Sequence, residues 1–146
     1  MSKMKWKPDQ RKEDALHKSV AQLLDVLIPG KWFHPPNGGK RSKAEAGIFK
    51  SLGVKKGVPD VFIEVPRGGF HGMRVELKTR YNKPTPEQRT WLAYYNGNGY
   101  YAIWANSFDE VEAAVKAYLN GKITNNGNGE IPYTQGVPSD RRYQPD

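Results

Sequence analysis

Three charged side chains fall at spacings that suit metal-dependent chemistry on a phosphate group. Asp60 begins one short hydrophobic run, and Glu76 and Lys78 lie two residues apart in a second run. Because strand side chains alternate between faces, Glu76 and Lys78 share one face, while Val75 and Leu77 share the other, which we expect to be core. A hairpin between the two runs would bring Asp60 beside Glu76 and Lys78.

The charges of this cluster indicate what it binds. Two neighbouring carboxylates repel each other unless a cation lies between them. Oxygen ligands in a chain without cysteine favour Mg²⁺ or Mn²⁺ over Zn²⁺. A lysine beside such an ion suits a phosphate substrate. We therefore expect a divalent-metal site at Asp60, Glu76 and Lys78.

A long amphipathic helix is predicted over residues 9–28 and carries a further acid. Glu13 heads a stripe at helical spacing whose other members are apolar: Leu16, Val20, Leu23, Leu24 and Leu27. A solvated glutamate has no reason to head such a stripe. Glu13 therefore either caps the helix N-terminus, where a negative charge is favourable, or reaches into a site.

The rest of the chain alternates between strand and helix patterns. Strands are expected over 31–34, 60–65, 75–78 and 100–105, with helices over 42–52, from 85 to about 96, and from 107 or 109 to about 119. Thr85 to Gln88 form a capping box, so the Gln88 side chain has a structural explanation. The three histidines, His17, His34 and His71, are predicted to be packed or exposed side chains, because no two of them have metal-ligand spacing in the sequence.

The motif Pro59-Asp60, a spacer, then Glu76-x-Lys78 resembles the signature of the PD-(D/E)XK nuclease superfamily. Within that superfamily the chain resembles the VRR-NUC (virus-type replication-repair nuclease) family over roughly residues 13 to 119. The resemblance rests on segments that occur in the family's order: Asn37-Gly38-Gly39 with Arg41, Gly57-Val58-Pro59-Asp60, Glu76-Leu77-Lys78-Thr79 and Gln88-Arg89-Thr90-Trp91. It implies an α/β, restriction-endonuclease-like αβββαβ core with a mixed central sheet flanked by helices.

The resemblance also implies roles for individual residues. Asp60, Glu76 and the backbone carbonyl of Leu77 would hold one or two Mg²⁺ or Mn²⁺ ions, assisted by Glu13 from the first helix. A water molecule activated by the metal would then hydrolyse a phosphodiester bond.

Two further residues would act beside the metal. Lys78 would orient or deprotonate the water or neutralise the phosphate, and the sequence does not separate these roles. In the family pattern Gln88 lies beside this lysine. The chain is similar to the compact, stand-alone form found in phages and prophages, which implies a homodimer acting on branched DNA such as four-way junctions.

Positive charge is concentrated in the first part of the chain. Residues 1–57 hold 13 Lys and Arg against five acids, and this excess equals the formal net charge of +8 of the whole protein. A polyanion is the natural partner of such a region. The expected nucleic-acid contacts lie in segments that flank the Asp60 strand: Asn37, Lys40, Arg41, Lys43, Lys55 and Lys56.

Length and composition point to one domain. With 146 residues, no apolar run long enough to span a membrane and no signal-peptide pattern, we expect a soluble protein in the cytoplasm of a bacterium or phage-infected cell. The nuclease-like domain is expected over 1–121. Residues 122–146 are rich in Asn, Gly and Pro without periodicity, and are expected to be disordered or to form an extended arm across a partner subunit.

Two other functions fit parts of the pattern. A non-catalytic nucleic-acid-binding module would keep the basic segments and use Glu76 and Lys78 as a salt bridge. A sequence-specific restriction enzyme is disfavoured, because little chain remains outside the core for target recognition. RNA stays open as a substrate.

Overall fold

The computed structural model describes residues 8–36, 42–127 and 130–146. Its elements, in chain order, are α1 (Pro8–Leu27), β1 (Trp32–Phe33), α2 (Lys43–Ser51), β2 (Val61–Ile63), β3 (Met73–Leu77), α3 (Pro86–Asn96), β4 (Tyr101–Ala105), α4 (Phe108–Leu119) and the 3-10 turn η1 (Ser139–Arg141). The expected α/β class and αβββαβ order are confirmed, with α2 inserted between β1 and β2 and α4 added after β4. Within the described ranges, no helix is both long and apolar enough to cross a bilayer.

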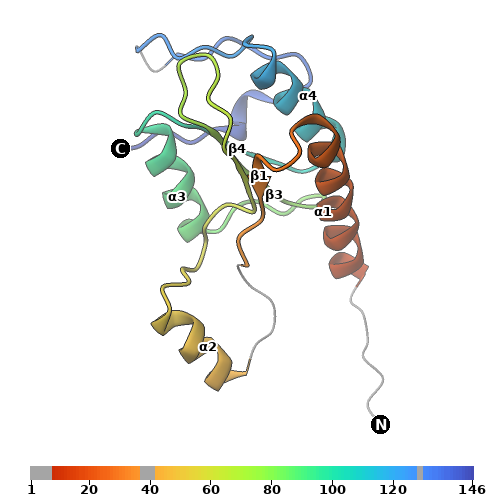
Figure 1. The fold of residues 1–146 in the computed structure, drawn as a ribbon, viewed down its shortest axis with the longest axis vertical. Coiled ribbons are helices and arrows are strands. Elements are labelled where there is room, and N and C mark those ends of the chain that lie inside the picture. The colour runs from red at the N-terminus through yellow and green to blue at the C-terminus, as the bar shows by residue number, and fades with distance from the viewer. Residues whose placement is uncertain (1–7, 37–41, 128–129) are drawn as a thin grey trace.

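The four strands form one mixed sheet in the order β1-β2-β3-β4. β2 runs antiparallel to both of its neighbours, β1 and β3, and β4 runs parallel to β3. The parallel pair is joined by α3, as a parallel crossover requires. α1 and α3 lie on opposite sides of the sheet, and α4 packs against α1 (Figure 1).

One face of the sheet forms the main core. Met73, Val75 and Leu77 of β3 are almost fully buried there. They belong to the same apolar cluster as side chains from α1 and α4: Val20, Leu24, Val111, Ala114, Val115 and Tyr118. The predicted core face of β3 is therefore confirmed, and so is the apolar stripe of α1 except for Leu23, which is half-buried and is not among the residues of this cluster.

The opposite face of β3 is also buried, which differs from the expectation that only one face would be core. Arg74 and Glu76 are 4% and 2% exposed. α3 covers this side, where Leu92 packs with Ala102 and Trp104 of β4. A strand between two other strands in a sheet with helices on both sides has no solvated face, so the Glu76 carboxylate lies in a low-dielectric environment.

The expected helix caps are present. Ser42 accepts from the Glu45 N–H at the start of α2, and Ser107 accepts from the Glu110 N–H at the start of α4. Thr85 and Gln88 form the reciprocal capping box of α3. α2 has no buried residues and stands apart from the sheet (Figure 1).

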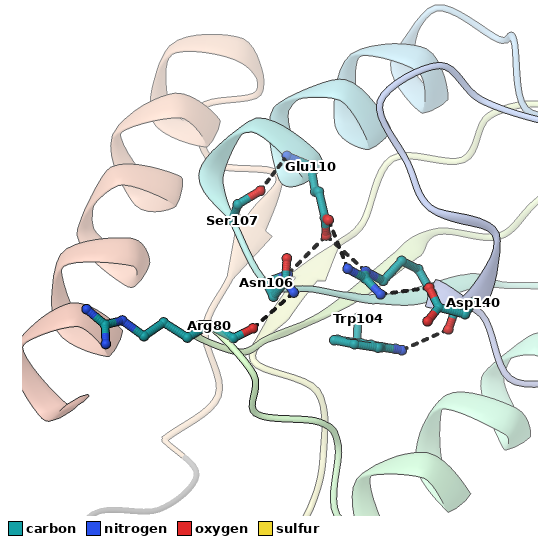
Figure 2. Close-up of polar contacts among 7 residues, drawn as sticks. Arg80, Trp104, Asn106, Ser107, Glu110 and Asp140 are labelled. Atoms are coloured by element: carbon teal, nitrogen blue, oxygen red, sulfur yellow. Dashed lines mark hydrogen bonds and ion pairs between the residues drawn. The ribbon is translucent and has the colours of Figure 1, made fainter.

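The C-terminal segment, expected from its composition to be disordered or an extended arm, contacts its own chain within residues 130–146. Arg141 donates to both carboxylate oxygens of Glu110, at 3.0 and 2.9 Å, and its guanidinium lies 4.0 Å from the centre of the Trp104 ring. The Trp104 indole donates to the carbonyl of Asp140 (3.1 Å; Figure 2). A few charged and aromatic anchors thus hold a segment that has little apolar content of its own.

Candidate metal centre

The strand register brings the two predicted carboxylates together. Val61 pairs with Val75 across the antiparallel β2–β3 ladder, so continuing this register by one residue places Asp60 opposite Glu76. Asp60 is itself 9% exposed, and its Oδ2 accepts a 2.8 Å hydrogen bond from the backbone N–H of Leu77. The hairpin therefore positions Asp60 against the Glu76–Leu77 stretch, as expected.

Glu76 is held in an environment that disfavours a lone negative charge. Burial, the charge of Asp60 and a hydrogen bond with it together raise the pKa of its carboxyl to about 10, although the charge of Lys78 lowers it. One oxygen, Oε2, is buried and has no hydrogen-bond partner. An unsatisfied buried carboxylate oxygen beside a second carboxylate fits a bound cation, which would supply the missing partner.

Lys78 lies at the edge of this carboxylate pair. Its side chain is mostly buried, and Nζ is 3.9 Å from Glu76 Oε1. Its backbone N–H donates to the carbonyl of Ala105 on β4, which fixes the end of the strand. Lys78 therefore faces the same site as Glu76 with its ammonium within reach of a ligand there.

The helix α1 places two further side chains, Glu13 and His17, near the carboxylate pair. Glu13 is exposed, yet its charge is among those that raise the pKa of Glu76, which places it near the carboxylate pair. His17 follows one turn later on the same helical face, and its Nε2 lies 3.9 Å from Asp60 Oδ2. Of the two readings of Glu13, this placement is the one expected for an acid that reaches toward a site.

Two histidines also lie at this site, although the sequence predicts them to be packed or exposed side chains and not metal ligands. His17, His34 and Asp60 each offer one ligand atom, and these atoms all lie within 4.8 Å of one another. His34 follows β1, and its ring meets that of His17 edge-on at 5.3 Å between centroids. The one sequence signal for this cluster is that His17 follows Glu13 by four residues.

The described contacts of Gln88 are those of the capping box rather than of the site. Its side-chain oxygen accepts from the Thr85 N–H (2.8 Å), and its own N–H donates to the Thr85 hydroxyl (3.3 Å). Gln88 therefore caps the N-terminus of α3, as the capping box predicts. Its catalytic role stays a prediction.

The predicted nucleic-acid contacts divide into two groups. Asn37, Lys40 and Arg41 lie outside the described residues. The other three lysines, Lys43, Lys55 and Lys56, are exposed. The backbone near Lys56 is tied to α3, because the Trp91 indole donates to the Lys56 carbonyl (3.2 Å).

Comparison with solved structures finds a likeness in both fold and sequence. A solved structure named "VRR_NUC domain protein" superposes with a TM-score of 0.65 and is 29% identical in sequence. The match covers 75% of this chain and 88% of the other. No protein-family model matches the sequence, and no curated protein matches it either.

Proposed function

We propose that this chain, which belongs to the VRR-NUC family, is a divalent-metal-dependent endonuclease that hydrolyses phosphodiester bonds in DNA. The observation that carries the proposal is the buried pair formed by Asp60, directly before β2, and Glu76 on β3, with Lys78 beside it. Two carboxylates in that position are costly without a cation, since burial and mutual repulsion both oppose their ionisation.

Mg²⁺ or Mn²⁺ would be held by Asp60, Glu76 and the backbone carbonyl of Leu77, with Glu13 assisting from α1. When bound, the cation would lower the pKa of a coordinated water and stabilise charge on the phosphate oxygens. The Leu77 N–H that donates to Asp60 Oδ2 supports this geometry, because the bond holds the Asp60 carboxylate against the Glu76–Leu77 stretch.

Lys78 would act on the water or on the phosphate. Its Nζ lies 3.9 Å from a Glu76 oxygen, so it is close enough to orient the attacking water or to neutralise the charge that builds up on phosphorus oxygens. Gln88 is proposed only to position Lys78, since its side-chain oxygen already caps α3.

The substrate is proposed to be DNA, gripped through the basic first part of the chain. Residues 1–57 carry the whole positive excess, and Lys55 and Lys56 lie a few residues before Asp60. Action as a homodimer on branched DNA such as four-way junctions, in the cytoplasm of a bacterial or phage-infected cell, is the finer part of the proposal. It rests on the resemblance to stand-alone members of the family.

The test is a cleavage assay on three labelled substrates: a four-way junction, a flap and a linear duplex. Each is incubated with wild-type protein in Mg²⁺, Mn²⁺ or EDTA, and with the Asp60→Ala variant. Metal-dependent cleavage that the variant lacks supports the nuclease, and symmetric nicks in the junction support the dimer. Tight binding without cleavage in either metal would instead favour the non-catalytic binding module.

A further inference from the structure

We propose that His17, His34 and Asp60 form a second cation position, selective for a transition-metal ion, next to the oxygen-only position between Asp60 and Glu76. The inference deepens the proposed function, because Asp60 would belong to both positions. Its evidence is separate, since the two histidines play no part in the mechanism proposed above.

The spacing of the three side chains fits ligands of one ion. His17 Nε2 and Asp60 Oδ2 are 3.9 Å apart, which is too long for a hydrogen bond. It is shorter than the roughly 4.2 Å that two ligands can span across one ion at about 2.1 Å each. The ligand atoms of all three residues lie within 4.8 Å of one another, so modest side-chain rotation would close the set.

The tautomer of His34 also fits a ligand. Its Nδ1 lies 2.5 Å from the backbone carbonyl of Asp60. A carbonyl only accepts, so Nδ1 must carry the proton and the lone pair is left on Nε2. A ring nitrogen that donates to a backbone carbonyl is the usual outer-shell contact of a metal-binding histidine, because it fixes both the ring and its tautomer.

Asp60 would bridge the two positions. Glu76 is not within the cluster of His17 and His34, and its oxygen Oε2 is buried without a hydrogen-bond partner. A carboxylate shared between two ions is the arrangement of two-metal sites that clamp both reacting oxygens of a phosphate. The Asp60–Glu76 position offers only oxygen and suits Mg²⁺. The histidine position offers two imidazoles and suits Zn²⁺ or Mn²⁺.

The competing explanation is plain packing. The edge-on contact of the two rings and the His34 hydrogen bond would hold these residues together without any ion. The two explanations differ in what they predict for metal binding. They also differ in which histidines matter, since His71, the third histidine of the chain, lies elsewhere against Tyr100.

The first experiment measures Zn²⁺ binding by calorimetry in excess Mg²⁺, which fills the oxygen-only position. Wild type is compared with His17→Ala and His34→Ala, with His71→Ala as the matched control. We expect at least about tenfold weaker Zn²⁺ binding in the first two variants and wild-type affinity in the control. Equal Zn²⁺ affinity in all four proteins would overturn the inference. His17→Gln and His34→Gln serve as replacements for any alanine variant whose circular dichroism shows loss of fold.

The second experiment looks for nitrogen ligands directly. One equivalent of Mn²⁺ is added to the Glu76→Gln variant, which lacks the oxygen-only position, and nitrogen coupling is read by pulsed electron paramagnetic resonance. Coupling that disappears in the Glu76→Gln, His34→Ala double variant supports the inference, and no coupling in Glu76→Gln contradicts it.

Neither experiment measures cleavage, so the two proposals can fail separately. Metal binding through histidine in a protein that cuts no DNA would contradict the proposed nuclease function and support the histidine cation position. Mg²⁺-dependent cleavage without histidine-bound metal would support the nuclease function and contradict the histidine cation position.

Discussion

Asp60, the residue before β2, is tied to the neighbouring strand β3 by a 2.8 Å hydrogen bond from the Leu77 N–H to its Oδ2. The bond satisfies a buried donor of β3 that would otherwise lack a partner. It also aims the carboxylate at Glu76, the residue before Leu77 in the chain. One contact therefore gives Asp60 a structural role in addition to the proposed role as metal ligand.

These two roles are separable by substitution. Asp60→Asn keeps an oxygen that accepts from Leu77 but loses the charge, so we expect a folded protein without cleavage activity. Asp60→Ala also leaves the Leu77 N–H unpaired, which should cost about 1–3 kcal/mol of unfolding free energy. Urea denaturation checks the difference. Equal stability of the two variants would show that the hydrogen bond contributes nothing.

The metal-free protein should lose stability as the pH rises. The folded-state pKa of Glu76 is raised from 4.5 to about 10, chiefly by burial, so the folded protein holds a proton that the unfolded chain has released. The contribution of Glu76 to the free energy of unfolding is therefore fully present below about pH 4.5, and it is lost as the pH rises toward 10. We expect a loss on the order of 1 kcal/mol or more between pH 5 and 8.

The pH effect has a built-in control. Glu76→Gln cannot ionise at this position, so its unfolding free energy in EDTA should vary less with pH than that of wild type. Mg²⁺ should reverse part of the loss in wild type alone, because the cation stabilises the ionised form. A wild-type profile that is no steeper than that of Glu76→Gln would contradict the assigned burial.

Lys78→Met should remove turnover while metal binding persists. The substitution keeps most of the apolar stem and deletes the ammonium that lies 3.9 Å from Glu76 Oε1. We expect a loss of cleavage rate of about 100-fold or more, with Mn²⁺ affinity within a few-fold of wild type. Lys83→Met is the matched control, since Lys83 is exposed. Full activity of Lys78→Met would remove the lysine from the mechanism.

The C-terminal segment should depend on one ion pair. Arg141 is 8% exposed and donates twice to Glu110, so Arg141→Met should destabilise the protein by about 3 kcal/mol. Lys116→Met, which breaks the exposed pair with Glu112, should cost no more than about 0.5 kcal/mol. Thermal unfolding of both variants checks this. Similar small effects would indicate that the segment contributes little to the fold.

Local signals in the sequence were sufficient for most of the scaffold. The capping box of Thr85 and Gln88 marks the start of α3, and the alternation of Val75 and Leu77 marks the core face of β3. The register that joins Asp60 to Glu76 follows from a hairpin between two short strands. Each of these features involves residues that are close in sequence or lie on consecutive strands.

Features that depend on distant packing were missed. His17 and His34 come together only because α1 lies along the sheet beside the end of β1, and their sequence spacing carries no such information. The burial of Glu76 requires α3 to cover its face of the sheet. The C-terminal segment is likewise held by the contact of Arg141 with Glu110, 31 residues earlier. The composition of this segment predicts disorder, because the sequence does not show that Arg141 contacts Glu110.

The central claim is that Asp60 and Glu76 hold a catalytic cation, and cleavage by Glu76→Gln tests it most directly. Wild type, Glu76→Gln and the matched control Glu112→Gln are assayed on labelled junction and duplex DNA in Mg²⁺ and in EDTA, with DNA affinity measured in parallel. The account predicts Mg²⁺-dependent cleavage by wild type and control, and none by Glu76→Gln at near wild-type DNA affinity. Undiminished cleavage by a folded Glu76→Gln protein would contradict it.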